Sequence, residues 1–285
     1  IDAEEVDRLE VSLLVFEQVL ASAEIDGWAG LGLALQAYQK RALPAIDWIA
    51  ETARRTQRQI TMRLVKGAYW DSEIKRAQEL GLSAYPVFTR KEHTDISYLA
   101  CAQRLMACGE MIYPQFATHN ARTAASIASL AGKRRTLEFQ RLHGMSDGLH
   151  RRLAQEDGFA TRTYAPVGRH KDLLPYLVRR LLENGANASF VNQLVEANPR
   201  LTDLVEDPIS VSERHGFSPH PKIPEPCHRD GQSRRVAAGT DLTQSNHVLD
   251  FEALAPPTPE ADAKTHSVFS PNDRRISVGS YTPSQ

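Results

Sequence analysis

One stretch of the sequence decides the fold, namely Ile60-Thr-Met-Arg63-Leu-Val-Lys66-Gly67-Ala-Tyr-Trp-Asp-Ser72. Its first residues have strand character and its last ones follow a helical pattern, so Arg63 and Lys66 stand where a strand ends. α/β enzymes place their chemistry at this end of a strand. A buried strand with an interior arginine is the alternative interpretation, because an arginine among apolar neighbours seldom lacks a partner. This stretch alone leaves both interpretations open.

The same order of strand and helix recurs on both sides of this stretch. We expect strands at the Ile1 stub and at residues 30–38, 60–65, 111–118, 136–142 and 161–167. We expect helices at residues 3–23, 41–56, 69–80, 96–107, 121–130 and 172–183, with a further polar helix after the strand at 136–142. Strands that alternate with helices at this spacing predict a parallel sheet with helical crossovers.

Two architectures fit this order, a doubly wound sheet and an eight-stranded (β/α)8 barrel of the TIM type. Polar residues are expected at the C-terminal ends of many different strands, as at the mouth of a barrel. They are Asp2, Gln36, Arg63, His119, Gln140 and Tyr164. The sequence therefore favours a barrel, and its six strand candidates predict an incomplete one.

Length and composition bound the function. The 285 residues, 41% of them hydrophobic, suffice for one large domain or two ordinary ones. A net charge of −1 without a basic stripe does not indicate nucleic-acid binding. The three cysteines show no metal-ligand spacing, so we expect no metal site and a reducing, cytoplasmic location. The sequence lacks an apolar run long enough to span a membrane, and its opening Ile1 indicates a piece of a longer protein.

The texture of the sequence changes at about Val205. Ten of the sixteen prolines lie beyond this residue, and the helical periodicity ends there. Such composition is typical of an extended linker. We therefore predict a first domain over residues 1–204, a proline-rich linker over 205–265 and a separate final segment over 266–285.

The predicted helix at 172–183 carries four polar residues on one side. They are Tyr176, Arg179, Arg180 and Glu183, opposite a leucine-rich face. A solvated outer helix with arginine–glutamate pairs is one interpretation. A carboxylate-binding clamp is the other, because a guanidinium matches a carboxylate with two parallel hydrogen bonds. Periodicity does not choose between them.

Several longer segments of the sequence resemble those of a known protein family. They are Asp2-Ala-Glu-Glu5, Gln36-Ala-Tyr-Gln-Lys40, the residues 63–71, 113–120 and 164–167, and the run from Tyr176 to Asn192. Together and in this order they resemble the proline dehydrogenase domain of the bifunctional proline utilization A flavoproteins. The resemblance covers Ile1 to about Pro226. Residues 268–279 resemble the opening of the aldehyde dehydrogenase domain that follows in those proteins, so a fused aldehyde dehydrogenase partner is implied.

The resemblance implies a distorted (β/α)8 barrel with FAD at its C-terminal mouth, here N-terminally truncated to about six of eight strands. It implies that L-proline is oxidised to 1-pyrroline-5-carboxylate by hydride transfer from ring carbon C5 to flavin N5. The electrons then pass to a membrane quinone, in the catabolism of proline to glutamate. This places the parent protein in the cytoplasm, at the inner face of the membrane.

The resemblance also implies the cofactor residues. Arg63 is implied to lie near flavin N5 as a catalytic residue, and Gln36 to hydrogen-bond the pyrimidine end of the isoalloxazine. The remaining FAD-binding residues are implied to be Val65, Lys66, Gly67, Ala68, Trp70, Thr118, His119, Asn120 and Gln140. In this scheme the cofactor supplies the redox chemistry, and the protein supplies position and electrostatic field.

The implied substrate residues come from three parts of the chain. Arg179 and Arg180 bind the proline carboxylate, and Glu183 orients the helix that carries them. Three tyrosines pack around the proline ring and exclude water, namely Tyr69, Tyr164 and Tyr176. Tyr69 and Asp2 are implied to act beside Arg63 in catalysis.

Asp2 is implied to pair with a lysine on an earlier strand, which this chain does not contain. We therefore expect that the 285 residues alone neither hold FAD tightly nor turn over proline.

Two other functions stay open. One is a non-catalytic barrel remnant that serves as a binding module, and the other is a flavoenzyme for a different cyclic amino acid such as hydroxyproline.

Overall fold

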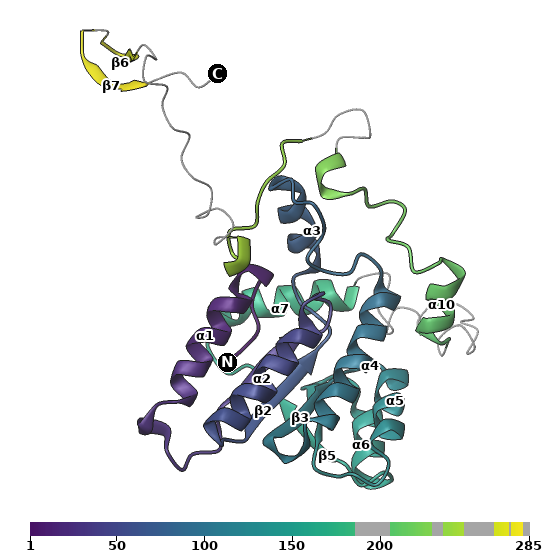
Figure 1. Cartoon of the computed structure of the whole chain (residues 1–285). Coiled ribbons are helices and arrows are strands. Elements are labelled where there is room, and N and C mark those ends of the chain that lie inside the picture. The colour runs from purple at the N-terminus through teal and green to yellow at the C-terminus, as the bar shows by residue number, and fades with distance from the viewer. Residues whose placement is uncertain (186–205, 230–235, 248–264, 274, 282–285) are drawn as a thin grey trace. The chain divides into compact units, whose positions relative to one another are not determined.

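The computed structural model describes residues 1–185, 206–229, 236–247, 265–273 and 275–281, and for residues 179–185 it describes the backbone alone (Figure 1). The chain divides into two compact units, residues 1–241 and 242–285, which we describe separately. Within the described residues, no helix combines the length and the apolar content that crossing a bilayer requires.

Among the described residues of the first unit, five parallel strands form one sheet in the order β1-β2-β3-β4-β5. Their bounds are Gly32–Gln36, Ile60–Val65, Ile112–Ala117, Glu138–Leu142 and Ala160–Tyr164. Ile1 extends this sheet beside β1, because its amino group donates to the Gly32 carbonyl at 2.7 Å and its carbonyl accepts from the Ala34 amide at 2.9 Å. Five of the six predicted strand positions are therefore strands of one α/β sheet in sequence order, and the sixth, Ile1, is hydrogen-bonded beside β1 without forming a strand. The described strands leave it open at β5.

Helices follow the strands as predicted. They are α1 Leu9–Leu20, α2 Ala42–Thr56, α3 Trp70–Glu79, α4 Lys91–Ala107, α5 Ala121–Ala131, α6 Asp147–Gln155 and α7 His170–Gly185. The helix α4 begins five residues earlier than its apolar pattern predicts, with a polar first turn in which Lys91 pairs with Asp95 at 3.0 Å. In α7 the predicted apolar face is half exposed, at 49% for Leu174 and 44% for Leu177.

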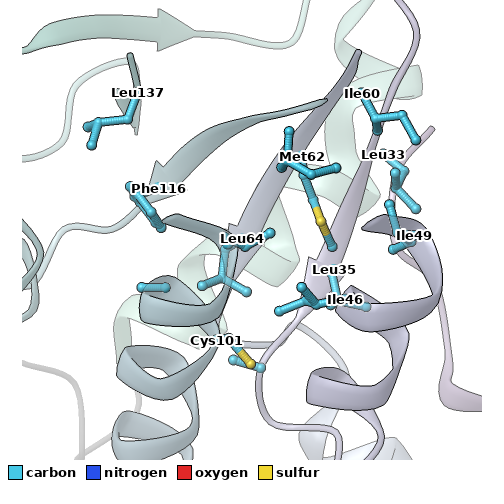
Figure 2. Packing of buried hydrophobic residues seen from close by; sticks show 14 of the residues in the cluster. Leu33, Leu35, Ile46, Ile49, Ile60, Met62, Leu64, Cys101, Phe116 and Leu137 are labelled. Atoms are coloured by element: carbon cyan, nitrogen blue, oxygen red, sulfur yellow. The ribbon is translucent and has the colours of Figure 1, made fainter. Parts of the chain in front are cut away.

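The alternation within β2 sorts its side chains onto two faces. Ile60, Met62 and Leu64 are fully buried, whereas Arg63 and its alternate neighbours are half-buried on the other face. Figure 2 shows the buried set packing, with neighbours from β1 and β3, against side chains of α2 and α4. Burial of each such side chain contributes about 1.5–3 kcal/mol, so this layer fixes the sheet against its helices.

The opposite face of the sheet is polar. The strand register places Arg63 beside Gln115 and Gln115 beside Glu138. In the next row Gln140 lies beside Arg162. Because in-register residues of parallel strands share a face, these side chains form one polar surface, which corresponds to the interior of the predicted barrel.

Beyond residue 205 the structure contains more regular elements than the sequence predicts. The helix α10 spans Pro208–Arg214 and a 3₁₀ turn, η4, spans Pro226–His228. Proline is tolerated in the first helical turn, so Pro208 begins a helix instead of preventing one. Arg122 of α5 fixes the start of α10 through Asp207 at 2.8 Å. The predicted domain boundaries stay predictions.

The second unit contains an antiparallel hairpin. Its strands are β6 His266–Phe269 and β7 Ser277–Tyr281, with a register irregularity at Val268. Nearly all side chains of the hairpin are exposed. This unit covers the segment for which the sequence predicts the beginning of a further domain.

Candidate active site

The C-terminal ends of β1, β2 and β3 lie at one edge of the sheet. Gln36 is in register with Val65, and the pairing continues past both strands because the Tyr38 amide donates to the Lys66 carbonyl at 2.7 Å. On the other side of β2, Leu64 is in register with Phe116. Since the strands are parallel, the predicted cofactor residues at 65–68 and 118–120 both follow this edge.

Arg63 lies between two other predicted site residues. Its Nη2 atom makes an ion pair with the Asp2 carboxylate. Its Cζ atom lies 5.6 Å from the centre of the Tyr164 ring. Its Nε atom is buried and makes no hydrogen bond within the described part of the chain. The structure thus brings together Asp2, Arg63 and Tyr164, and it gives Asp2 an arginine partner in this chain.

Gln36 connects the N-terminal segment with the turn after β2. Its Nε2 atom donates to the Glu4 carbonyl at 2.7 Å, and its Oε1 atom accepts from the Ala68 amide at 2.9 Å. The Tyr69 hydroxyl donates to the Glu4 carboxylate at 2.7 Å. Glu4 is therefore a residue of this edge that the sequence reasoning missed as a site residue. Its signal in the sequence is its place two residues after Asp2, in one of the segments that carry the family resemblance.

Lys66 is engaged within the protein. Its ammonium pairs with Asp95 of α4, which also accepts from Lys91 at 3.0 Å. Burial lowers the pKa of Lys66. Burial alone would raise the pKa of Asp95, but the two ammonium groups hold it below its ordinary value. Two cations share one carboxylate, so this cluster keeps a net positive charge beside the strand end.

Gly67 is a glycine for a packing reason that the sequence does not reveal. A Cβ atom at this position would lie 2.4 Å from the ring of Tyr38, which is buried. Three residues on, the indole of Trp70 donates to the Phe88 carbonyl at 2.8 Å. The turn between β2 and α3 is therefore held by contacts on both sides.

The predicted segment Thr118-His119-Asn120 forms the entry to α5. The Asn120 Oδ1 atom caps this helix by accepting from the Thr123 amide at 2.9 Å, and the Thr118 hydroxyl accepts from the Asn120 amide at 3.1 Å. His119 Nε2 accepts from the Leu142 amide at 3.1 Å. The N-terminus of a helix favours anions, so this turn suits a phosphate group.

A buried carboxylate that the sequence reasoning missed organises the polar face of the sheet. Arg162 donates to both oxygens of Glu138, at 2.8 and 3.0 Å, and the amides of Gln140 and Gln115 donate to the same carboxylate at 2.6 and 2.7 Å. Burial alone would raise the pKa of Glu138, but these donors lower it. Gln140, a predicted cofactor residue, is oriented by this carboxylate.

For the part of α7 that carries the two predicted substrate arginines, the structure describes the backbone only. Arg179, Arg180 and Glu183 belong to α7, and their side chains lie outside the described residues. Tyr176 lies one helical turn earlier and is half-buried. The predicted carboxylate clamp therefore stays a prediction.

The fold and this edge define an α/β enzyme domain of the kind that carries its chemistry at the C-terminal ends of parallel strands. The polar groups gathered there come from five strand ends and the helices after them. Residues 1–193 match the sequence model of the proline dehydrogenase family. The chain belongs to this family.

A similar protein and two solved structures support this assignment. The chain is 46% identical to the bifunctional protein PutA of Salmonella typhimurium, over 98% of this chain and 23% of that protein. A crystal structure of proline utilization A from Bradyrhizobium japonicum matches with a TM-score of 0.84 and 50% identity, over 90% of this chain and 27% of that one. A further structure with the same TM-score and identity is of proline utilization A with proline bound in remote sites, matched over 90% of this chain and 27% of that one. The chain thus spans about a quarter of the length of these relatives.

Proposed function

We propose that this chain forms the proline-oxidising part of a bifunctional proline utilization protein, which converts L-proline to 1-pyrroline-5-carboxylate in the catabolism of proline to glutamate. The observation that carries the proposal is the position of Arg63 between the Asp2 carboxylate and the Tyr164 ring, at the polar edge of the sheet. Membership of the proline dehydrogenase family supports the reaction class.

We propose FAD as the cofactor, and the residues at this edge fit it. The buried Nε–H of Arg63 is a hydrogen-bond donor without a partner among the described residues, and the N-terminus of α5 favours a phosphate. Bound FAD would accept a hydride from ring carbon C5 of proline at its N5 atom. The cofactor would be held by Gln36, Arg63, Val65, Lys66, Gly67, Ala68, Trp70, Thr118, His119, Asn120 and Gln140.

The chain's own side chains would position this chemistry. The guanidinium of Arg63 supplies fixed positive charge where negative charge develops, and Asp2 and Tyr164 hold it in place. Glu4 fixes the hydroxyl of Tyr69, so that this ring is oriented beside the same edge. A preorganised arrangement of this kind needs little rearrangement during the reaction.

The substrate would be held from α7. Arg179 and Arg180 would bind the carboxylate of proline in two-point geometry. Glu183 would orient them, while Tyr164 and Tyr176 would cover the apolar ring together with Tyr69. These roles rest on the family resemblance and on the backbone position of α7.

The partners of the parent protein are part of the proposal. Electrons from proline would pass to a membrane quinone, and the parent protein would act in the cytoplasm at the inner face of the membrane. Residues 266–285 would begin a fused aldehyde dehydrogenase domain that follows a linker over 205–265. The similarity of most of the chain to bifunctional relatives supports this arrangement.

We also propose that the 285 residues alone neither hold FAD tightly nor turn over proline. Four of the five residues of β5 are exposed, as are the apolar side chains of α7 at Leu174 and Leu177. This sheet edge and helix face, exposed within the described residues, give the side chains around the site few packing contacts. Purified chain that is yellow with flavin and oxidises proline would contradict this point, but not the proposed reaction of the parent protein.

The test of the proposed function is Arg179→Met in the intact parent protein. Loss of a two-point contact to the proline carboxylate should raise KM for proline by about tenfold or more. The matched control is Arg169→Met, because Arg169 precedes α7, its side chain is 74% exposed, and its ion pair among the described residues is a local one with Asp172 at 2.8 Å. An unchanged KM in Arg179→Met, or an equal rise in both variants, would refute the carboxylate clamp.

A further inference from the structure

Three potential metal ligands converge at the 3₁₀ turn η4, in a part of the chain that the proposed function does not use. They are Glu225, Cys227 and His228, and their ligand atoms all lie within 4.8 Å of one another. The Cys227 Sγ atom is 3.6 Å from His228 Nδ1, and the same nitrogen is 3.2 Å from a Glu225 carboxylate oxygen. The sequence predicted no metal site, because adjacent residues do not form a recognised ligand spacing.

Two of the three separations match those around a tetrahedral ion, and the third, between Cys227 Sγ and the Glu225 carboxylate, is within 4.8 Å. Zinc bonds to sulfur and to nitrogen of about 2.3 and 2.05 Å place these two atoms about 3.6 Å apart. Bonds of about 2.0–2.1 Å to nitrogen and oxygen place those atoms about 3.3 Å apart. Both expected separations agree with the observed 3.6 and 3.2 Å. A thiolate, an imidazole and a carboxylate are also the ligand types that zinc prefers.

The contacts favour a cation over a hydrogen-bonded catalytic group. In a nucleophilic triad the imidazole uses one nitrogen for the thiol and the other for the carboxylate. Here the single atom Nδ1 of His228 faces both Cys227 and Glu225, so no proton relay between the two is possible. One proton on this nitrogen would have to be shared between sulfur and oxygen. A cation at the centre of the three atoms binds all of them.

The turn is also held in place by other contacts. The Tyr85 hydroxyl donates to the Pro224 carbonyl at 2.6 Å, and the Val236 amide donates to the Cys227 carbonyl at 2.9 Å. Cys227 is 4% exposed, whereas Glu225 reaches the solvent. A buried thiolate ligand with an open side is a geometry in which water completes the coordination of the ion.

We propose that Glu225, Cys227 and His228 bind one zinc-type divalent cation, which stabilises the turn η4. The ion would bind when the thiol of Cys227 loses its proton, and His228 would bind through Nδ1. This site is separate from the residues to which we assign proline oxidation, so the proposal of a cation site does not depend on that assignment.

The test uses the full chain, freed of metal and kept reduced, with Co²⁺ as the spectroscopic probe. One equivalent of Co²⁺ should produce a thiolate-to-cobalt charge-transfer band, and one equivalent of Zn²⁺ should remove it. The band should be absent in Cys227→Ser, and Co²⁺ should bind about tenfold or more weakly in His228→Gln and Glu225→Gln. The matched control is Cys108→Ser, which removes a half-buried thiol on another element and should leave the band unchanged.

Two results would overturn the proposal. One is the absence of a thiolate band with the unaltered chain. The other is a band that persists in Cys227→Ser, which would place the cobalt on another cysteine. If Cys227→Ser does not fold by circular dichroism, Glu225→Gln decides in its place, and unchanged Co²⁺ affinity in that folded variant counts against the site.

Discussion

The guanidinium of Arg63 lies against the ring of Tyr164, with 5.6 Å between Cζ and the ring centre. Arg63 comes from the second strand of the sheet and Tyr164 from the end of the fifth, so their contact spans the polar face. A cation over an aromatic ring contributes about 0.5–2 kcal/mol, depending on its exposure. With Asp2 as its second partner, the arginine is fixed from two sides.

This contact predicts a large effect of Arg63→Met in the intact parent protein. The turnover number for proline should fall by about 10²–10³-fold, because a fixed cation near developing negative charge is lost. Arg63→Lys keeps the charge but not the planar geometry, and we expect an intermediate value. Steady-state kinetics with proline and an artificial electron acceptor measure both.

The control for these variants is Arg54→Met. The Arg54 side chain is 59% exposed, and within the part of the chain that the structure describes its ion pair is with Glu51 one helical turn away. Its removal should leave the turnover number within about twofold, as is usual for surface pairs. Were Arg63→Met as active as this control, the central position of Arg63 in the chemistry would be wrong.

The sequence predicted the elements of this edge but not their partners. The apolar alternation of β2 and the helix after it follow from local periodicity, and so does the position of Arg63 at the strand end. The pairing of Lys66 with Asp95 joins a strand end to a helix whose start was not predicted. Such a contact depends on how α4 packs on the sheet, which periodicity does not determine.

Glu138 illustrates the same limit on the polar face. In the sequence it is one acidic residue near the start of a predicted strand. Its four donors come from β3, β4 and β5, and only the strand register brings them to it. The requirement for glycine at position 67 also depends on a residue distant in the sequence, because the Tyr38 ring that leaves no room for a side chain belongs to the segment after β1. Local patterns therefore predicted the fold, and packing supplied the contacts within the site.

The buried carboxylate of Glu138 predicts a pH-dependent contribution to stability. Its pKa in the folded chain is lowered by Arg162 and two amides, so the charged form is stabilised by folding. This stabilisation is fully present above the unfolded value of roughly 4.3 and is lost as pH falls through the folded value. Glu138→Gln should therefore cost about 1–2 kcal/mol at pH 7.

Urea unfolding of the chain and of Glu138→Gln at pH 7 and at about pH 3 measures this difference. The difference in the free energy of unfolding between the two proteins should be smaller at the lower pH. Glu51→Gln is the matched control, because Glu51 is 63% exposed and should show little effect at either pH. A difference in the free energy of unfolding that stays constant or grows in acid would contradict the assigned role of the Glu138 charge.

The approach of Gly67 to Tyr38 predicts opposite effects for two glycine substitutions. Gly67→Ala should destabilise the chain by about 1–3 kcal/mol, because its Cβ would meet the buried Tyr38 ring at 2.4 Å. The Tyr38 ring is 2% exposed and packs in a buried cluster with Ile74 and Val87, so it has little room to move away from the new methyl group. Gly148→Ala, in open space within α6, should stabilise by about 0.5–1 kcal/mol.

A double-mutant cycle identifies the cause of the Gly67 effect. In a Tyr38→Ala background the ring is gone, and Gly67→Ala should then cost less than it does beside the native tyrosine, with the positive φ of 157° at Gly67 accounting for the remaining cost. Urea unfolding of the four proteins of the cycle gives the coupling free energy between the two positions. A cost of Gly67→Ala that is the same in both backgrounds would show that backbone conformation, and not the Tyr38 ring, requires glycine at the turn after β2.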